Sequence, residues 1–108
     1  MSIDTAATPA PFFHGTEAER TRLLPIAEKL CWWDAPAVAL RNRTRFLAQV
    51  MTLGNWEDVR TVREVFGIEA LRDVLSEPPA GVFDDASWIY WHHFLRIDPV
   101  PPLPRRRL

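Results

Sequence analysis

The sequence has 108 residues, of which 47% are hydrophobic and 25% are charged. A chain of this length forms one domain with a core sufficient for independent folding, and this composition is typical of a globular protein, not a disordered or fibrous one. The formal net charge of -1 gives no general preference for nucleic acid or membrane surfaces. The only cysteine is Cys31, which excludes an internal disulfide and favours a reducing cytoplasm as the location.

Basic residues are concentrated at the C-terminal end of the chain. Without Arg105, Arg106 and Arg107, 10 basic residues stand against 14 acidic ones, which is a net charge of -4. The N-terminal end does not have the basic and then apolar pattern of a secretion signal, and no apolar run reaches the roughly 18 residues of a membrane span. We therefore expect neither secretion nor membrane contact.

The first predicted helix follows a segment rich in proline and small residues, 1–15, which we expect to be flexible. Thr16 and Glu19 have the spacing of a capping box, so the helix is predicted to begin there. Pro25 has no amide donor and clashes with the preceding turn, so it either kinks this helix or begins a second one. We favour a second, short helix that begins at Pro25 and runs to Trp33.

Three further helices are predicted before residue 80. Asp34 and the proline two residues later favour the start of a helix that reaches Leu53 and stops at Gly54. Asn55 is a good N-cap for the next helix, which carries one apolar stripe and ends at Gly67. Another short helix then precedes the two prolines at 78 and 79.

The last predicted helix begins near Asp84 or Asp85 and includes the stretch ASWIYWHHFLRI, 86–97. His92 lies at the edge of its apolar face and His93 on the other side, so the two imidazoles cannot bind one metal ion together. We expect no metal site and no cofactor. The apolar face, which is predicted to be core, comprises Trp88, Tyr90, Trp91, Phe94 and Leu95.

No segment alternates apolar and polar residues for long enough to predict a strand. The sequence therefore predicts an all-α protein, a compact bundle of about five short helices over residues 16–98. Residues 99–108 are predicted to form an extended tail that is rich in proline and arginine.

The residues in this sequence that could belong to a catalytic site have ordinary structural explanations. Cys31 lies in the apolar stretch LCWW, which is typical of a buried and inert thiol. Asp84 and Asp85 precede an apolar helix, where capping accounts for both carboxylates. The four glycines lie at element boundaries and form no phosphate-binding loop. We expect no enzymatic activity.

Nucleic-acid binding is the alternative function. Arg41 and Arg45 are predicted to lie one helical turn apart, in a stretch, 35–56, that has no acidic residue. The segment VREVFGIEALRDVL has some likeness to a helix-turn-helix, but Glu69 and Asp73 in its second half would repel phosphates. A regulator of this kind would use Arg41, Arg45 and the C-terminal arginines.

A protein-binding role is the leading interpretation. Five tryptophans exceed what one small core needs, and large exposed aromatic side chains favour interfaces. The tail segment PPLPRRR also fits the P-x-x-P-x-R pattern of a polyproline II ligand. We expect a protein partner, whose candidate contacts are Trp32, Trp33, Trp56, Leu103, Arg105, Arg106 and Arg107.

Four segments together resemble a known family. They are LCWWD (30–34), FLAQVMTLGNWEDV (46–59), VFGIEALRDVL (65–75) and ASWIYW (86–91). The family that they resemble consists of small bacterial helical proteins of unknown function, a fraction of which are encoded beside nucleotidyltransferase-like toxins of abortive-infection systems. The resemblance implies an antitoxin-like or accessory partner protein and brings no catalytic residues with it.

Overall fold

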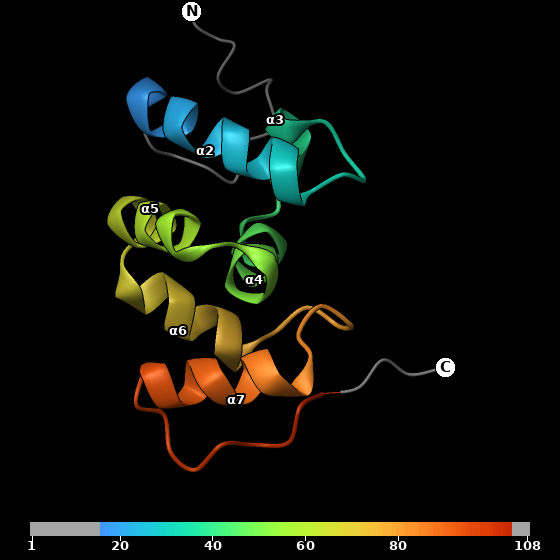
Figure 1. The fold of residues 1–108 in the computed structure, drawn as a ribbon, viewed down its shortest axis with the longest axis vertical. Coiled ribbons are helices and arrows are strands. Elements are labelled where there is room, and N and C mark those ends of the chain that lie inside the picture. Colours follow the sequence, from blue (N-terminus) through green and yellow to red (C-terminus); the bar gives the residue numbers. More distant parts are fainter. Residues whose placement is uncertain (1–15, 105–108) are drawn as a thin grey trace, which may run out of the picture.

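A computed structural model describes residues 16–104 of the chain and contains six α-helices, with no strand among these residues. In chain order the helices are α2 (Glu17–Leu30), α3 (Pro36–Ala39), α4 (Arg43–Leu53), α5 (Trp56–Phe66), α6 (Ile68–Ser76) and α7 (Asp85–Phe94) (Figure 1). The predicted all-α class and compact helical bundle are confirmed. The predictions for residues 1–15 and 105–108, including the three tail arginines, lie outside the described residues.

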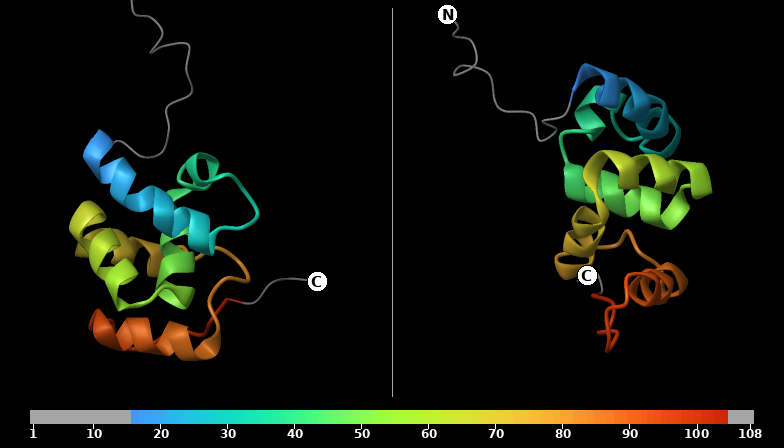
Figure 2. Two further views of the ribbon diagram at one scale, coloured as in Figure 1. Left: turned by 45° about the horizontal axis from the view of Figure 1, so that its top comes forward. Right: turned by 90° about the vertical axis from the view of Figure 1, so that its left-hand side faces the viewer.

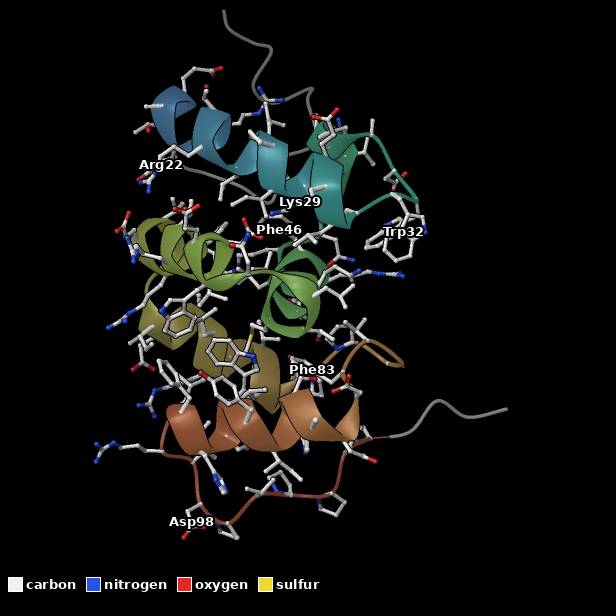
Figure 3. The ribbon with its side chains drawn as sticks, in the orientation of Figure 1. Arg22, Lys29, Trp32, Phe46, Phe83 and Asp98 are labelled. Carbon is white, nitrogen blue, oxygen red and sulfur yellow. The ribbon has the colours of Figure 1, made fainter. Side chains whose placement is uncertain are left out.

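Helix α4 lies at the centre of the molecule. It packs against α2, α5, α6 and α7. Figures 1 and 2 show α2 and α3 at one end, α4 and α5 in the middle, and α7 at the opposite end. All six residues from 46 to 51 are buried, and Phe46 lies in the interior between α2 and the middle helices (Figure 3). None of the helices between residues 16 and 104 is both long and apolar enough to cross a membrane.

Helix α2 continues through Pro25, so the prediction of a second helix from Pro25 to Trp33 is wrong. The proline side chain is exposed and so is Thr21, whose carbonyl group lacks an amide donor at position 25. An interior proline costs about 3 kcal/mol or more, whereas each large aliphatic side chain contributes roughly 1.5–3 kcal/mol when buried. Leu23 and Ile26 are both buried on the opposite side of α2. Their packing offsets the cost and keeps the helix in one piece.

The predicted helix from Asp34 to Leu53 is also wrong, because the chain forms two helices there. The N-cap of α3 is Ala35 instead of Asp34, and no side chain caps it. The chain leaves the helical path after Leu40, and the side-chain oxygen of Asn42 accepts a 3.1 Å hydrogen bond from the backbone N–H of Arg45. This N-cap starts a new helix in a new direction, and it explains why a continuous apolar pattern does not give a continuous helix.

The predicted starts of α2, α5 and α7 and the predicted ends of α4 and α5 agree with the structure, whereas α7 ends at Phe94 and does not include residues 95–97. Capping boxes begin α2, α5 and α7 at Thr16, Asn55 and Asp84, where each side chain accepts a hydrogen bond from a first-turn backbone N–H. Gly54 ends α4 and Gly67 ends α5. Gly67 has a φ of 91° and a ψ of 160°, a backbone conformation that is essentially restricted to glycine.

The buried face of α7 differs from the predicted one. Trp88, Trp91 and Leu95 are buried as expected, but His92 is buried too, and its Nδ1 lies 2.8 Å from the carbonyl oxygen of Trp88. Because a carbonyl oxygen only accepts, Nδ1 must carry the proton. The prediction that Tyr90 and Phe94 belong to the core is wrong, since they are 48% and 39% exposed.

A segment C-terminal to α7 packs against this helix from the side opposite α4. The chain turns back at Arg96, which has a φ of 60°, and residues 97–104 then run along α7 (Figure 1). We call residues 97–104 the C-terminal strap. Its apolar residues Ile97, Val100 and Leu103 are partly buried against the core. Leu103, predicted to contact a partner, thus packs on its own chain.

Candidate protein-binding surface

Two of the five tryptophans lie in the core, two lie on the surface and one is partly buried. Trp88 and Trp91 belong to the core, and the indole Nε1 of Trp91 donates a 2.6 Å hydrogen bond to the carbonyl oxygen of Met51 in α4. Trp32 and Trp56 lie on the surface with 74% and 58% of their area exposed, and a third, Trp33, is partly buried. Large aromatic side chains of this kind are enriched at protein interfaces.

Trp56 forms a cluster with two exposed rings of α7. Its ring centroid lies 6.1 Å from that of Phe94 in an edge-to-face arrangement, and Phe94 lies 5.9 Å from Tyr90 in a stacked one. We call Trp56, Tyr90 and Phe94 the aromatic face. Trp56 is the first residue of α5, where the capping box of Asn55 fixes the direction of the helix. The aromatic face is therefore built on two rigid helices.

A pocket of about 140 Å³ adjoins the aromatic face. Val59 of α5 and Leu71 of α6 are buried and make its apolar floor. Trp56 and Phe94 form one part of its rim, and Arg60 and Arg63 form another. Both arginines are exposed and lie one helical turn apart on α5. The pocket thus combines an apolar floor, aromatic walls and two cations.

The cations of this pocket make no ion pair with another described residue. The ion pairs between residues 16 and 104 are Arg20–Glu17, Arg22–Glu64, Lys29–Asp58 and Arg72–Glu69. Glu64, which is close enough to feel the charge of Arg60, is already bound by Arg22 at 2.6 Å. The hydrogen bond from Arg22 is the main reason that the pKa of Glu64 lies below its ordinary value.

A second hollow surrounds Trp32 and Trp33 at the end of α2. The guanidinium of Arg45 lies 4.5 Å from the ring centroid of Trp33, a cation–π contact, and the two indoles meet edge to face at 5.3 Å. Leu53, which is 55% exposed, also lines this hollow. Trp32 projects from the chain directly after α2 (Figure 3).

The structure does not bring the arginines that were predicted to bind nucleic acid into one site. Arg45 lies in the first turn of α4, whereas Arg41 lies in the link between α3 and α4, so the expected spacing of one helical turn is wrong. Both side chains are exposed. Arg45 already stacks on Trp33, and the tail arginines lie outside the described residues.

Two buried titratable side chains, Cys31 and His92, have surroundings that indicate a structural role. Burial raises the pKa of the Cys31 thiol to about 11, so the thiol is protonated at neutral pH and is a poor nucleophile. The ring of His92 packs against Trp88 with 4.3 Å between centroids and donates through Nδ1 to the carbonyl of its own helix. Among residues 16–104, no group of three or more His, Cys, Asp or Glu side chains is arranged to hold a metal ion.

Comparison with known proteins adds no further information about this surface. The sequence matches no family model, and neither the curated proteins nor the solved structures give a match. The resemblance to the small bacterial helical family therefore stays a prediction.

The sequence predicts Trp56 at this surface but not the side chains around it. Tyr90 and Phe94 are predicted to be core because they continue the apolar face of Trp88, Trp91 and Leu95. A helix that carries more apolar residues than its neighbours cover leaves some of them exposed. An excess of apolar residues on α7 was therefore a usable signal. Arg60 and Arg63 follow the buried Val59 and Val62 in the same helix and carry no distinctive pattern of their own.

Proposed function

We propose that this protein is a non-enzymatic protein-binding module that receives its partner on the aromatic face of α5 and α7. The observation that carries the proposal is the contact among Trp56, Phe94 and Tyr90, each of which leaves 39–58% of its area exposed. Exposed and mutually packed aromatic rings lose little rotamer freedom when a partner covers them, and they bury a large apolar area. These properties characterise interface hot spots.

The rigidity of the face supports the proposal. Trp91 lies beneath it, with its ring centroid 5.3 Å from both Tyr90 and Phe94, and its indole is fixed to the carbonyl of Met51. The core therefore holds the exposed rings in place before a partner arrives. Binding by a preformed surface avoids much of the entropic cost of ordering side chains.

The identity of the partner is a separate question. The family resemblance implies a toxin partner, and we retain an antitoxin-like role as a prediction within this proposal. The second class of function, nucleic-acid binding, would use Arg41, Arg45 and the tail arginines instead of the aromatic face. The two classes differ in which substitutions abolish binding.

Affinity capture from cells of the source organism tests the proposal. Tagged full-length protein is compared with Trp56→Ala, Phe94→Ala and the control Ile89→Ala, which removes a 48% exposed side chain of α7 outside the aromatic face. Loss of a hot-spot aromatic costs about 2 kcal/mol or more, a roughly 30-fold loss of affinity. We expect stoichiometric recovery of one partner with the wild type and Ile89→Ala, and little with the other two variants.

Three outcomes contradict this proposal. Equal recovery of the partner with Trp56→Ala and the wild type moves the contact away from the aromatic face. Recovery of nucleic acid that depends on Arg41 and Arg45 favours the alternative function. Recovery of no partner by the wild type removes the protein-binding proposal.

A further inference from the structure

We infer that the partner presents an acidic segment to the aromatic face: one large apolar side chain enters the pocket, and carboxylates beside it pair with Arg60 and Arg63. This inference rests on the proposed function and commits it to one partner chemistry.

The pocket has the size and lining for a single apolar side chain. It encloses about 140 Å³ above the buried side chains of Val59 and Leu71. An apolar cavity of about 150 Å³ is known to accept a benzene ring. Trp56 and Phe94 extend the apolar surface outward from the floor, so an inserted aromatic or branched aliphatic side chain contacts side chains on several sides. Burial of that side chain supplies the affinity.

The charges of the rim determine what flanks the inserted side chain. Arg60 and Arg63 are like charges one helical turn apart, and neither is neutralised by an ion pair with another residue in 16–104. Glu57 lies one turn before Arg60 but forms no ion pair with it. The guanidinium group presents a planar fork that matches a carboxylate with two hydrogen bonds. Asp or Glu next to the inserted side chain therefore complements the rim.

A polypeptide fits this surface better than a single-stranded nucleic acid does. A single-stranded nucleic acid carries a charge on every nucleotide and needs cations along its length, whereas residues 16–104 contain 10 Lys and Arg against 13 Asp and Glu. Glu57 and Glu64 lie within one turn of Arg60, so the basic part of the rim is limited to Arg60 and Arg63. It matches one or two carboxylates but not an extended run of phosphates. Stacking of successive bases uses an open series of rings, whereas this pocket takes one group into an apolar hollow.

Selection from a library of random peptides displayed on phage tests the inference with the full-length protein. The variants are R60E/R63E, W56A and the control R41E/R43E, which makes the same charge change on exposed arginines outside the pocket. Circular dichroism and thermal unfolding confirm that each variant folds, and R60Q/R63Q replaces R60E/R63E if the latter does not.

We expect the wild type and R41E/R43E to enrich peptides with an aromatic or large aliphatic residue flanked by Asp and Glu. R60E/R63E should bind an enriched peptide at least about tenfold more weakly and should itself select Lys and Arg as flanking residues. W56A should lose affinity for all of these peptides.

Three other outcomes overturn the inference, and the first two of them leave the proposed function to the capture experiment. Enrichment of apolar peptides without acidic residues, unaffected by R60E/R63E, leaves a protein-binding face but removes the acidic partner. If the wild type enriches no peptide, the partner does not bind through a linear segment, and the capture experiment above then decides the proposed function. Tighter binding of an oligothymidine than of the best peptide at physiological salt, lost in R60E/R63E, assigns the pocket to nucleic acid.

Discussion

The indole Nε1 of Trp88 donates a 2.8 Å hydrogen bond to the carbonyl oxygen of Pro101, 13 residues further along the chain. This bond holds the C-terminal strap against α7, and Trp88 is only 3% exposed beneath it. The sequence around Pro101 matches a polyproline II ligand, and within this structure its backbone carbonyl is already bound by a tryptophan of the same chain. The strap is thus part of the folded domain.

Replacement of Trp88 with Phe should loosen the strap. The variant keeps most of the buried apolar area but removes the only hydrogen that the indole donates to Pro101. We expect the free energy of unfolding to fall by about 1 kcal/mol and the backbone amides of the strap to exchange faster with solvent. Urea unfolding and hydrogen exchange measure the two effects. Unchanged exchange in residues 97–104 would show that the apolar contacts of Val100 and Leu103 hold the strap without the bond.

Replacement of Gly67 with Ala should destabilise the link between α5 and α6. A Cβ at position 67 would meet no atom within 4 Å, so the expected loss of stability does not come from crowding. It comes from the positive φ of 91°. The strain costs on the order of 1–3 kcal/mol. Gly54→Ala is the comparison, because its φ of -71° is ordinary but its Cβ would lie 2.7 Å from the carbonyl oxygen of Val50.

Chemical denaturation of both glycine variants measures these costs. Gly67→Asn should cost about as much as Gly67→Ala, because the tolerance of asparagine for positive φ applies to the left-handed helical region and not to a ψ of 160°. Equal stability of Gly67→Ala and the wild type would contradict the strained conformation at this link.

Removal of the Asp84 carboxylate should destabilise the protein in a pH-dependent manner. The backbone N–H and the hydroxyl of Ser87 bind this carboxylate and hold its pKa below the ordinary value of 3.8. A lowered pKa gives stability that is fully present above pH 3.8 and is lost as the pH falls through the pKa of the folded state. Asp84→Ala should cost about 1 kcal/mol at pH 7.

Thermal unfolding of the Asp84 variants between neutral and acidic pH separates the two contributions. The difference between the wild type and Asp84→Ala should shrink as the pH falls below 3.8. Asp84→Asn retains a capping side chain without the titration, so its cost relative to the wild type should vanish at low pH. A difference that stays constant with pH would rule out a role for the ionised carboxylate.

Replacement of Arg96 with Gly should stabilise the protein. Arg96 adopts a φ of 60°, and the two backbone hydrogen bonds that close α7 run from Arg96 N–H to His93 and from Ile97 N–H to His92. This is a Schellman motif, in which glycine is the usual residue at the left-handed position. Relief of the Cβ clash is worth roughly 1 kcal/mol. Thermal unfolding measures the gain, and Arg96→Ala, which keeps the clash, should show none.

Features that neighbouring residues determine are predictable from the sequence. Thr16, Asn55 and Asp84 were identified as caps because each bonds to a backbone group within three residues. The continuous path of α2 through Pro25 could not be predicted in this way. It depends on Leu23 and Ile26 meeting a core built from helices further along the chain.

The candidate surface also combines features that the sequence predicts with features that depend on distant parts of the chain. The exposure of Trp32 and Trp56 agrees with the expectation from the excess of tryptophans, which also included Trp33, a partly buried residue. The exposure of Tyr90 and Phe94 is not predictable from α7 alone, because it depends on which sides of this helix α4 and the strap cover, and the strap reaches α7 through a reversal at Arg96. No sequence pattern distinguishes Arg60 and Arg63, and only the pocket that they line indicates a role in binding.

The burial of six consecutive residues in α4 has a consequence for how the chain tolerates sequence change. A helix with one covered side accepts substitutions at most positions and rejects them about every third or fourth residue. In α4, all positions from Phe46 to Met51 meet protein, and even the amide of Gln49 is used, donating to the carbonyl of Leu30 at the end of α2. A scan of random substitutions should therefore reveal an unbroken block of intolerance in α4, beside helices that show the usual periodic pattern.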